Sequence, residues 1–193
     1  MRIIRRATYR TMPWKNGGGE TTEIAVSPEG ASFENFDWRV SMARVASDGP
    51  FSVLPGVDRT LTVLEGNGIT LLPEERGAVT LTRDTAPFSF PADWPLEARL
   101  TDGPLLDLNV MTRRGRYRSF VSCAVTAAPI RCEAKGDALL LLIRGGAATL
   151  HRDTDSSDLG EGDTILLSKA DGRISLRPAQ KLAVHMIDLW AAG

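Results

Sequence analysis

The stretch TLTVLEGNGITLLP, residues 60–73, decides the fold class, because it reads as a strand, a glycine turn and a second strand. Its two arms are strand-sized, rich in leucine and β-branched residues, and bounded by turn residues. A second stretch, LLLLIRGGAATLHR at residues 139–152, repeats the same order. The pair suggests an internal duplication.

Turn residues divide the rest of the chain in the same way. The sequence holds 18 glycines and 11 prolines, and the segments between them, roughly 8–12 residues apart, alternate in polarity or are uniformly apolar. Few windows keep a helical period beyond two turns. We therefore predict an all-β fold, a sandwich or barrel with little helix, whose two parts join between about residues 112 and 135.

Composition predicts a soluble cytoplasmic protein without nucleic-acid or membrane partners. The formal charge is -1 and the sequence pI is about 6.1, so no broad electrostatic attraction for polyanions exists. The first ten residues, MRIIRRATYR, lack the apolar core of a signal peptide. No run approaches the ~20 apolar residues of a membrane span. Cys123 and Cys132 are accordingly expected to be reduced.

The sequence predicts neither a metal nor a cofactor. Its two histidines, His151 and His185, stand apart and match no metal-ligand spacing. Walker, G-x-S-x-G and strand-linked G-x-G-x-x-G motifs are missing as well.

An arginine-rich segment, TRRGRYRS at residues 112–119, has two interpretations. It could be a nucleic-acid patch, since basic residues are interleaved with a tyrosine. A solvated connection is favoured, because the chain has no second basic cluster and a slightly acidic total charge.

The opening motif MPWKNGGGETTEIAV, residues 12–26, combines a flexible bend with polar side chains. Gly17–Gly19 can adopt positive φ and bring backbone amides close to another group. The bend could serve only to begin a strand, or it could hold Lys15 and Asn16 toward an anion. In the strand that follows, Thr21, Glu23 and Ala25 would face water or a cavity, and Thr22, Ile24 and Val26 would face the core.

Further polar candidates lie in three later strands. In WRVSMARV, residues 38–45, Arg39 and Ser41 share a small face, so Arg39 could hold an anion or form an ordinary salt bridge. Asp58 and Arg59 are adjacent and must point to opposite faces of a regular strand. Asn109, alone in the apolar run LLDLNVM, could contact a ligand or cap a neighbouring backbone.

Three segments together resemble the HutD/Ves family of small proteins, many of them associated with bacterial histidine utilisation. They are MPWKNGGGETTEI, WRVSMARVASDGPFSVLPGVDRTLTVLEGNGITL and LLDLNVMTRRG, in that order. The resemblance implies a bicupin, with one cupin half over residues 1–115 and a second over 116–193, packed as one compact unit. It also implies a metal-free cavity, since the family lacks the histidine set with which cupins commonly hold a metal.

The resemblance implies a regulatory or accessory protein that binds a small carboxylate such as urocanate or N-formylglutamate. The ligand-binding residues carried over from the motifs are Lys15, Asn16, Thr21, Glu23, Arg39, Ser41, Asp58, Arg59 and Asn109.

Two other functions stay open. One is a metal-independent isomerase or hydrolase acting on a small organic acid, with Glu23 or Asp58 as general base. The other is a partner-binding module, including a homodimer formed through exposed sheet edges.

Overall fold

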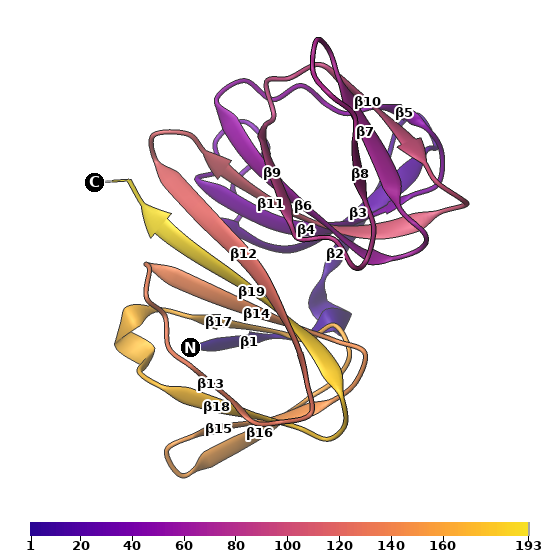
Figure 1. The fold of residues 1–193 in the computed structure, drawn as a ribbon. Coiled ribbons are helices and arrows are strands. Elements are labelled where there is room, and N and C mark those ends of the chain that lie inside the picture. The colour runs from indigo at the N-terminus through magenta and orange to yellow at the C-terminus, as the bar shows by residue number, and fades with distance from the viewer. Residues whose placement is uncertain (193) are drawn as a thin grey trace. The chain divides into compact units, whose positions relative to one another are not determined.

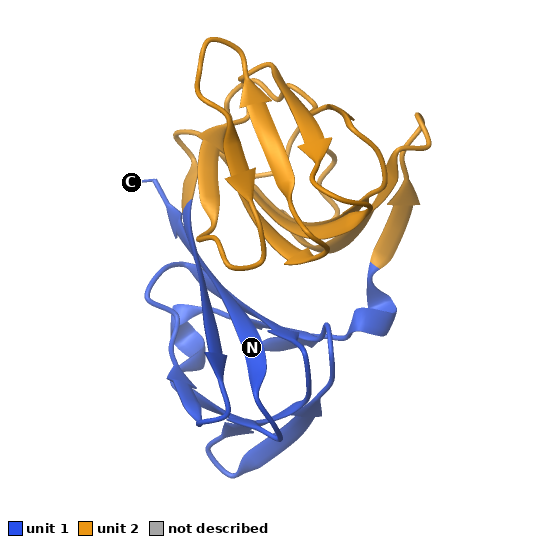
Figure 2. Cartoon of the chain, turned by 45° about the vertical axis from the view of Figure 1, so that its right-hand side comes forward, with its two compact units in different colours: residues 1–9, 119–193 blue, residues 10–118 orange. Residues whose placement is uncertain are grey.

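The computed structural model describes residues 1–192, and strands form nearly all of its regular structure, which confirms the all-β prediction. Two short 3-10 turns, η1 (Arg6–Thr8) and η2 (Lys169–Asp171), are the helical elements of this described part. It contains no helix of the length and apolarity needed to cross a membrane. The chain forms two compact units, residues 10–118 and residues 1–9 with the chain from 119 onward (Figure 2).

The unit of residues 10–118 contains two sheets (Figure 1). The six-stranded sheet has the order β2 (Arg10–Pro13), β3 (Gly19–Ser27), β4 (Trp38–Val45), β11 (Leu105–Arg113), β6 (Val57–Glu65) and β9 (Phe88–Pro91). The four-stranded sheet has the order β5 (Gly49–Pro50), β10 (Leu96–Leu100), β7 (Ile69–Pro73) and β8 (Val79–Leu81).

The other unit also contains two sheets. The five-stranded sheet has the order β1 (Arg2–Ile4), β17 (Thr164–Leu167), β14 (Ala138–Arg144), β19 (Leu182–Ala191) and β12 (Tyr117–Thr126). The four-stranded sheet has the order β13 (Ile130–Cys132), β18 (Ile174–Pro178), β15 (Ala148–Arg152) and β16 (Asp155–Leu159).

The stretch of residues 60–73 turns a corner between sheets and does not form a hairpin. Its first arm, in β6, pairs with β11 and β9, whereas its second arm, β7, pairs with β10 and β8. Gly66 and Gly68 in the turn have φ values of 93° and 136°, which glycine adopts readily. Residues 139–152 behave in the same way, because β14 and β15 lie in different sheets. Each stretch therefore links the two layers of its own unit.

Alternating residues of these strands build a separate apolar core in each unit. Leu61 and Val63 of β6 belong to the core of the unit of residues 10–118. Leu139, Leu141 and Ile143 of β14 belong to the core of the other unit. The period-two pattern expected for strands is thus realised on the faces that meet between sheets.

The first nine residues lie with the C-terminal unit, whereas the sequence-based division placed them in an N-terminal half of residues 1–115. β1 pairs antiparallel with β17, with Arg2 opposite Leu166 and Ile4 opposite Thr164. Ile3 packs against the apolar core of that unit. Burial of Ile3 and the ladder to β17 draw this segment away from its sequence neighbours.

A β-bulge in β3 corrects the predicted division of that strand into two faces. Glu23 lies opposite Ser41, but Ala25 lies opposite Val40 and Val26 opposite Arg39. One extra residue between Glu23 and Ala25 reverses the alternation, as bulges do.

Candidate functional site

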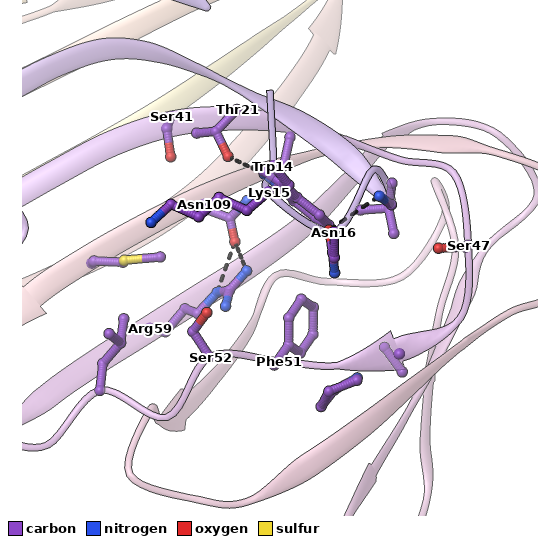
Figure 3. Close-up of a pocket in the computed structure, with 18 of the residues that line it drawn as sticks. Trp14, Lys15, Asn16, Thr21, Ser41, Ser47, Phe51, Ser52, Arg59 and Asn109 are labelled. Carbon is purple, nitrogen blue, oxygen red and sulfur yellow. Dashed lines mark hydrogen bonds between the residues drawn. The ribbon is translucent and has the colours of Figure 1, made fainter. Parts of the chain in front are cut away.

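A cavity of about 420 Å³ opens within the unit of residues 10–118. Its polar wall comes from alternate residues of β4 and β11 together with Arg59 of β6 (Figure 3). The segment between β4 and β6 supplies much of the remaining lining, from residues 47–52 and 54. The lining residues named by position are Trp14, Lys15, Asn16, Gly18, Thr21, Phe33, Arg39, Ser41, Ala43, Val45, Ser47–Ser52, Leu54, Arg59, Ala98, Asn109 and Met111.

Strand register places two arginines on either side of one methionine. Met111 of β11 is the direct partner of Arg39 on β4 and of Arg59 on β6. Directly paired residues point to the same face of a sheet, and neighbouring strands lie ~4.8 Å apart, so the two arginine Cα atoms are separated by about 10 Å. Two residues before Met111 on β11, Asn109 lies directly opposite Ser41 of β4 and on the same face. This wall of the cavity therefore presents cationic and neutral polar side chains next to one another on three neighbouring strands.

Arg59 is almost completely buried and is held by an amide. Its Nε donates a hydrogen bond of 2.7 Å to Asn109 Oδ1, and its Nη2 donates to the same oxygen. Asn109 Nδ2 in turn donates to Asp107 Oδ1. The guanidinium also lies over the Phe51 ring, 4.2 Å from its centroid. Among the described residues no carboxylate contacts Arg59 directly.

Burial shifts the pKa of both charged groups in this chain of contacts. Desolvation lowers the pKa of Arg59 to about 10, although the negative charge of Asp107 opposes the shift. Desolvation raises the pKa of Asp107 to about 6, against the attraction of Arg59 and the hydrogen bond from Asn109. The lowered pKa of Arg59 and the raised pKa of Asp107 both mean that burial disfavours the charged form of the side chain. The pair therefore carries an unusual electrostatic cost inside the fold.

Arg39 has a different environment. Its Nε donates a hydrogen bond of 2.8 Å to Glu23 Oε2, and its guanidinium carbon lies 4.7 Å from the Phe33 ring centroid. The side chain of Glu23 is 23% exposed and that of Arg39 is 6% exposed. Arg39 is thus already neutralised by a carboxylate, which leaves Arg59 as the less compensated cation of the two.

The glycine-rich motif shapes the mouth of the cavity. Trp14 Nε1 donates to Thr21 Oγ1 at 2.8 Å, and the Gly18 amide donates to Asn16 Oδ1 at 3.1 Å (Figure 3). Lys15 and Asn16 are exposed at this rim. The bend therefore presents Lys15 and Asn16 at the mouth of the cavity.

The structure brings seven of the nine candidate residues to the cavity and leaves two outside its lining. The seven are Lys15, Asn16, Thr21, Arg39, Ser41, Arg59 and Asn109. Glu23 contributes indirectly, through Arg39.

Asp58 lies away from the cavity. It accepts hydrogen bonds of 3.0 and 2.7 Å from Arg114 Nε and Nη2. Because Asp58 and Arg59 are adjacent in a regular strand, the inward direction of Arg59 sends Asp58 outward. Of these two adjacent residues, the structure thus turns Arg59 toward the cavity and leaves Asp58 outside its lining.

Sequence reasoning missed Asp107 and both aromatic contacts to the arginines. Asp107 precedes Asn109 by two residues in an apolar strand, so a shared face was predictable from the period of two. Phe33 and Phe51 lie outside the long strands, in segments whose paths no local pattern determines.

Three arginines of residues 112–119 make contacts within the unit of residues 10–118. Arg113 Nη2 donates to the Glu34 carbonyl oxygen at 2.9 Å. Arg114 Nη1 contacts Asp93 Oδ2 at 2.7 Å, and Arg116 Nη1 lies 2.9 Å from Asp37 Oδ1. The segment joins the end of β11 to the start of β12, and its residues Arg114 and Arg116 are exposed.

Three or more His, Cys, Asp or Glu side chains do not converge as a metal site anywhere in residues 1–192. His185 is buried, and its Nε2 lies 3.9 Å from Cys123 Sγ. Burial and the positive charge of Arg144 lower the pKa of His185 to about 4. The polar groups that line the cavity are arginine, lysine, amide and hydroxyl groups, which can donate hydrogen bonds, and one carboxylate, Asp48; this set suits an anion better than a metal cation.

Comparison with known sequences finds a match to one family profile, HutD, over residues 6–185. The chain is 46% identical over 112 residues to Protein Ves of Cronobacter sakazakii, covering 58% of this chain and 60% of that protein. It is 35% identical over 119 residues to an uncharacterized 21.2 kDa protein in the hutC 3′ region of Pseudomonas putida, covering 62% of each. The chain thus spans about three fifths of the length of these curated relatives.

Solved structures match over nearly the whole chain. A conserved protein of unknown function from Pseudomonas aeruginosa PAO1 superposes with a TM-score of 0.89 at 28% identity, covering 98% of both chains. HutD from Pseudomonas fluorescens, in a formate condition, superposes with a TM-score of 0.83 at 28% identity, covering 100% of this chain and 99% of that one. The Escherichia coli protein YlbA, at 10% identity and a TM-score of 0.69, shares the fold alone. These neighbours make the fold cupin-like.

Proposed function

Because the chain belongs to the HutD family, we propose that it is a metal-free cupin that binds a small carboxylate metabolite. Urocanate and N-formylglutamate are the candidate ligands, and the role is regulatory or accessory in histidine utilisation. Two relatives support this context: one lies in the hutC 3′ region of Pseudomonas putida, and the Pseudomonas fluorescens HutD structure comes from a formate condition.

The observation that carries the proposal is the state of Arg59. Arg59 is 7% exposed and lines the cavity, and its guanidinium is held by an amide oxygen, so its positive charge has no carboxylate in direct contact among the described residues. A ligand carboxylate that reached the remaining guanidinium edge would form a charge-assisted hydrogen bond in a desolvated setting, where such bonds are strong.

The other lining groups suit the remainder of such a ligand. Phe33 and Phe51, which also contact the two guanidiniums, add apolar lining for the body of the ligand, while Ser41, Thr21 and Asn16 offer neutral hydrogen-bonding groups. Lys15, exposed at the mouth, adds positive potential that favours the approach of an anion.

The proposal extends to a bicupin architecture. Each unit consists of two sheets, and in each a glycine-containing segment, residues 60–73 or 139–152, carries the chain from one sheet to the other. This shared path supports two cupin halves derived from one ancestral half.

Calorimetric titration with urocanate, N-formylglutamate, glutamate and formate tests the proposal. We expect at least one of them to bind, and Arg59→Ala to weaken that binding by about 10- to 100-fold, the equivalent of a lost charge-assisted bond. Arg99→Ala, an exposed arginine on β10 of the same unit, should leave affinity unchanged.

Two results would contradict the proposal. One is the lack of binding heat with all four acids, and the other is equal affinity for the wild type and Arg59→Ala.

A metal-independent isomerase or hydrolase is less well supported, because neither proposed general base is available. Asp58 lies outside the cavity and bonds Arg114, and Glu23 is held by Arg39. An NMR time course in which the protein converts one of the same acids would favour the enzyme instead.

A further inference from the structure

Asp107 is a carboxylate buried at 0% exposure beside the proposed ligand site. Its strand partners, Ala43 on β4 and Val63 on β6, both belong to the apolar core. The groups that act on its charge are the Arg59 guanidinium, the Asn109 amide and the main chain of Ala43. Arg39 and Glu23, further along the same face, are paired with each other. Asp107 therefore depends on Arg59 as its counter-charge.

The hydrogen bonds of Asn109 fix which oxygen of Asp107 is engaged. Arg59 has only donors, so Asn109 must direct Oδ1 toward it and Nδ2 toward Asp107. Asp107 Oδ1 accepts that bond, while Oδ2 is buried without a hydrogen-bond partner among residues 1–192. A proton on Oδ2 would thus neutralise Asp107 and leave the contacts of Asn109 and Arg59 intact.

A bound carboxylate would compete with Asp107 for the same positive charge. In the free protein, one buried guanidinium balances one buried carboxylate through the Asn109 amide. A ligand anion on Arg59 would leave two negative charges with one cation in a desolvated wall, an arrangement that carries a high free-energy cost. We propose that binding of a carboxylate ligand at Arg59 is coupled to the uptake of a proton from solvent at Asp107 Oδ2, an inference that rests on the proposed function.

The direction of the pH dependence follows from linkage. Burial already raises the pKa of Asp107 to about 6 in the free protein, and the ligand anion raises it further. Affinity should be constant below pH ~6, should fall above it by up to about tenfold per pH unit, and should level off above the pKa of the complex. Protons are taken up within that falling window.

Calorimetry of the wild type with N-formylglutamate tests the coupling without any substitution. This probe is chosen over urocanate because ordinary carboxyl groups titrate near pH 4 and stay ionised throughout the window, whereas an imidazole does not. The binding enthalpy is measured at pH 7 in Bis-Tris and in Tris, two amine buffers whose ionisation enthalpies differ and which add no buffer anion that could compete for Arg59. The difference between the two binding enthalpies, divided by the difference between the buffer ionisation enthalpies, gives the number of protons taken up. We expect it to be about half a proton or more for each ligand bound. Formate serves as a second probe with one carboxylate.

Two variants locate the proton. Asp107→Asn keeps an oxygen that accepts from Asn109, so it should still bind, with no buffer dependence and a flat affinity between pH 6 and 8. Asp58→Asn removes a carboxylate that lies outside the cavity and should retain the wild-type uptake.

The outcomes separate this inference from the proposed function. Binding by the wild type with equal enthalpies in both buffers overturns the coupling alone, and so does undiminished uptake by Asp107→Asn. If Asp107→Asn does not fold, the wild-type buffer comparison still decides whether a proton is taken up. Absence of binding with every acid overturns the proposed function, and the coupling with it.

Discussion

Gly17, Gly18 and Gly19 meet three different requirements at the mouth of the cavity. Gly17 has a φ of 71°, a left-handed conformation that side chains disfavour. A Cβ on Gly18 would meet the Ser47 hydroxyl, which can rotate away. A Cβ on Gly19 would clash with the main-chain oxygen of Arg44 and would also press on the Trp14 ring. Of these contacts, only that between Gly19 and the main-chain oxygen of Arg44 involves a neighbouring backbone, which cannot move aside easily.

Gly19→Ala should therefore lower the free energy of unfolding by about 2 kcal/mol or more, the range of overpacking in a fixed structure. Urea denaturation measures the change. Gly77→Ala, with open space around its Cβ position, should shift stability by no more than about 0.5 kcal/mol. Equal effects of the two substitutions would contradict the close approach at Gly19.

At this scale the sequence predicted the chemistry better than the directions of side chains. It named Arg39, Arg59 and Asn109 from their residue types, and all three line the cavity. It could state that Asp58 and Arg59 face opposite ways, yet not which of them faces inward, because strand periodicity has no absolute phase. The phase is set by pairing with β11, a contact distant in sequence.

β11 is the element on which the site depends most. It runs between β4 and β6, and its residues Asp107, Asn109 and Met111 recur at the strand period. Asn109 joins the buried charges of its neighbours, Asp107 on the same strand and Arg59 on the next. The strand thus couples the interior of the sheet to the cavity wall.

Asn109→Leu should lower the free energy of unfolding by about 2–4 kcal/mol, because both buried charges lose their shared hydrogen-bonding partner. Thermal or urea unfolding measures it. Asn67→Leu, which removes exposed hydrogen bonds to Asp102 at 3.2 Å, should cost less than about 1 kcal/mol. A loss at position 109 no larger than that at position 67 would show that the buried amide does not stabilise the charges.

Strands could be predicted as elements, whereas their partners could not. The glycine turns of residues 60–73 and 139–152 suggest local pairing, but the two arms of each stretch do not pair with each other. The first arms, β6 and β14, pair with strands farther along the chain, and the second arms, β7 and β15, pair within the other sheet of the unit. The sequence does not indicate the bulge in β3 either, since no turn residue interrupts TTEIAV where the register shifts. Both features arise from tertiary pairing, which overrides local pattern.

The whole chain is divided differently in space and in sequence. Residues 10–118 form one unit, and the other unit takes strands from both ends of the chain. Its five-stranded sheet has β1 at one edge, paired with β17 alone. No signal in residues 1–9 reveals this, because a three-residue strand has too few positions to specify a partner.

Ile3→Ala should act on the C-terminal unit. Ile3 pairs with Ile165 and packs against that unit's core, so the substitution should lower its local stability by about 1 kcal/mol. Hydrogen exchange should become faster in β14 and β17 and stay unchanged in β4 and β11. Faster exchange in β4 and β11 instead would contradict the assignment of β1 to the C-terminal unit.

The pairing of β1 with β17 also imposes an order on events during synthesis. Domains generally fold as units while the chain leaves the ribosome from its N-terminus. Residues 10–118 have all their strand partners as soon as β11 emerges, whereas Arg2 must wait for Leu166. β1 is thus made before the other described strands and is among the last of them to be paired, and its apolar residues Ile3 and Ile4 stay unprotected until residues 164–167 have been made.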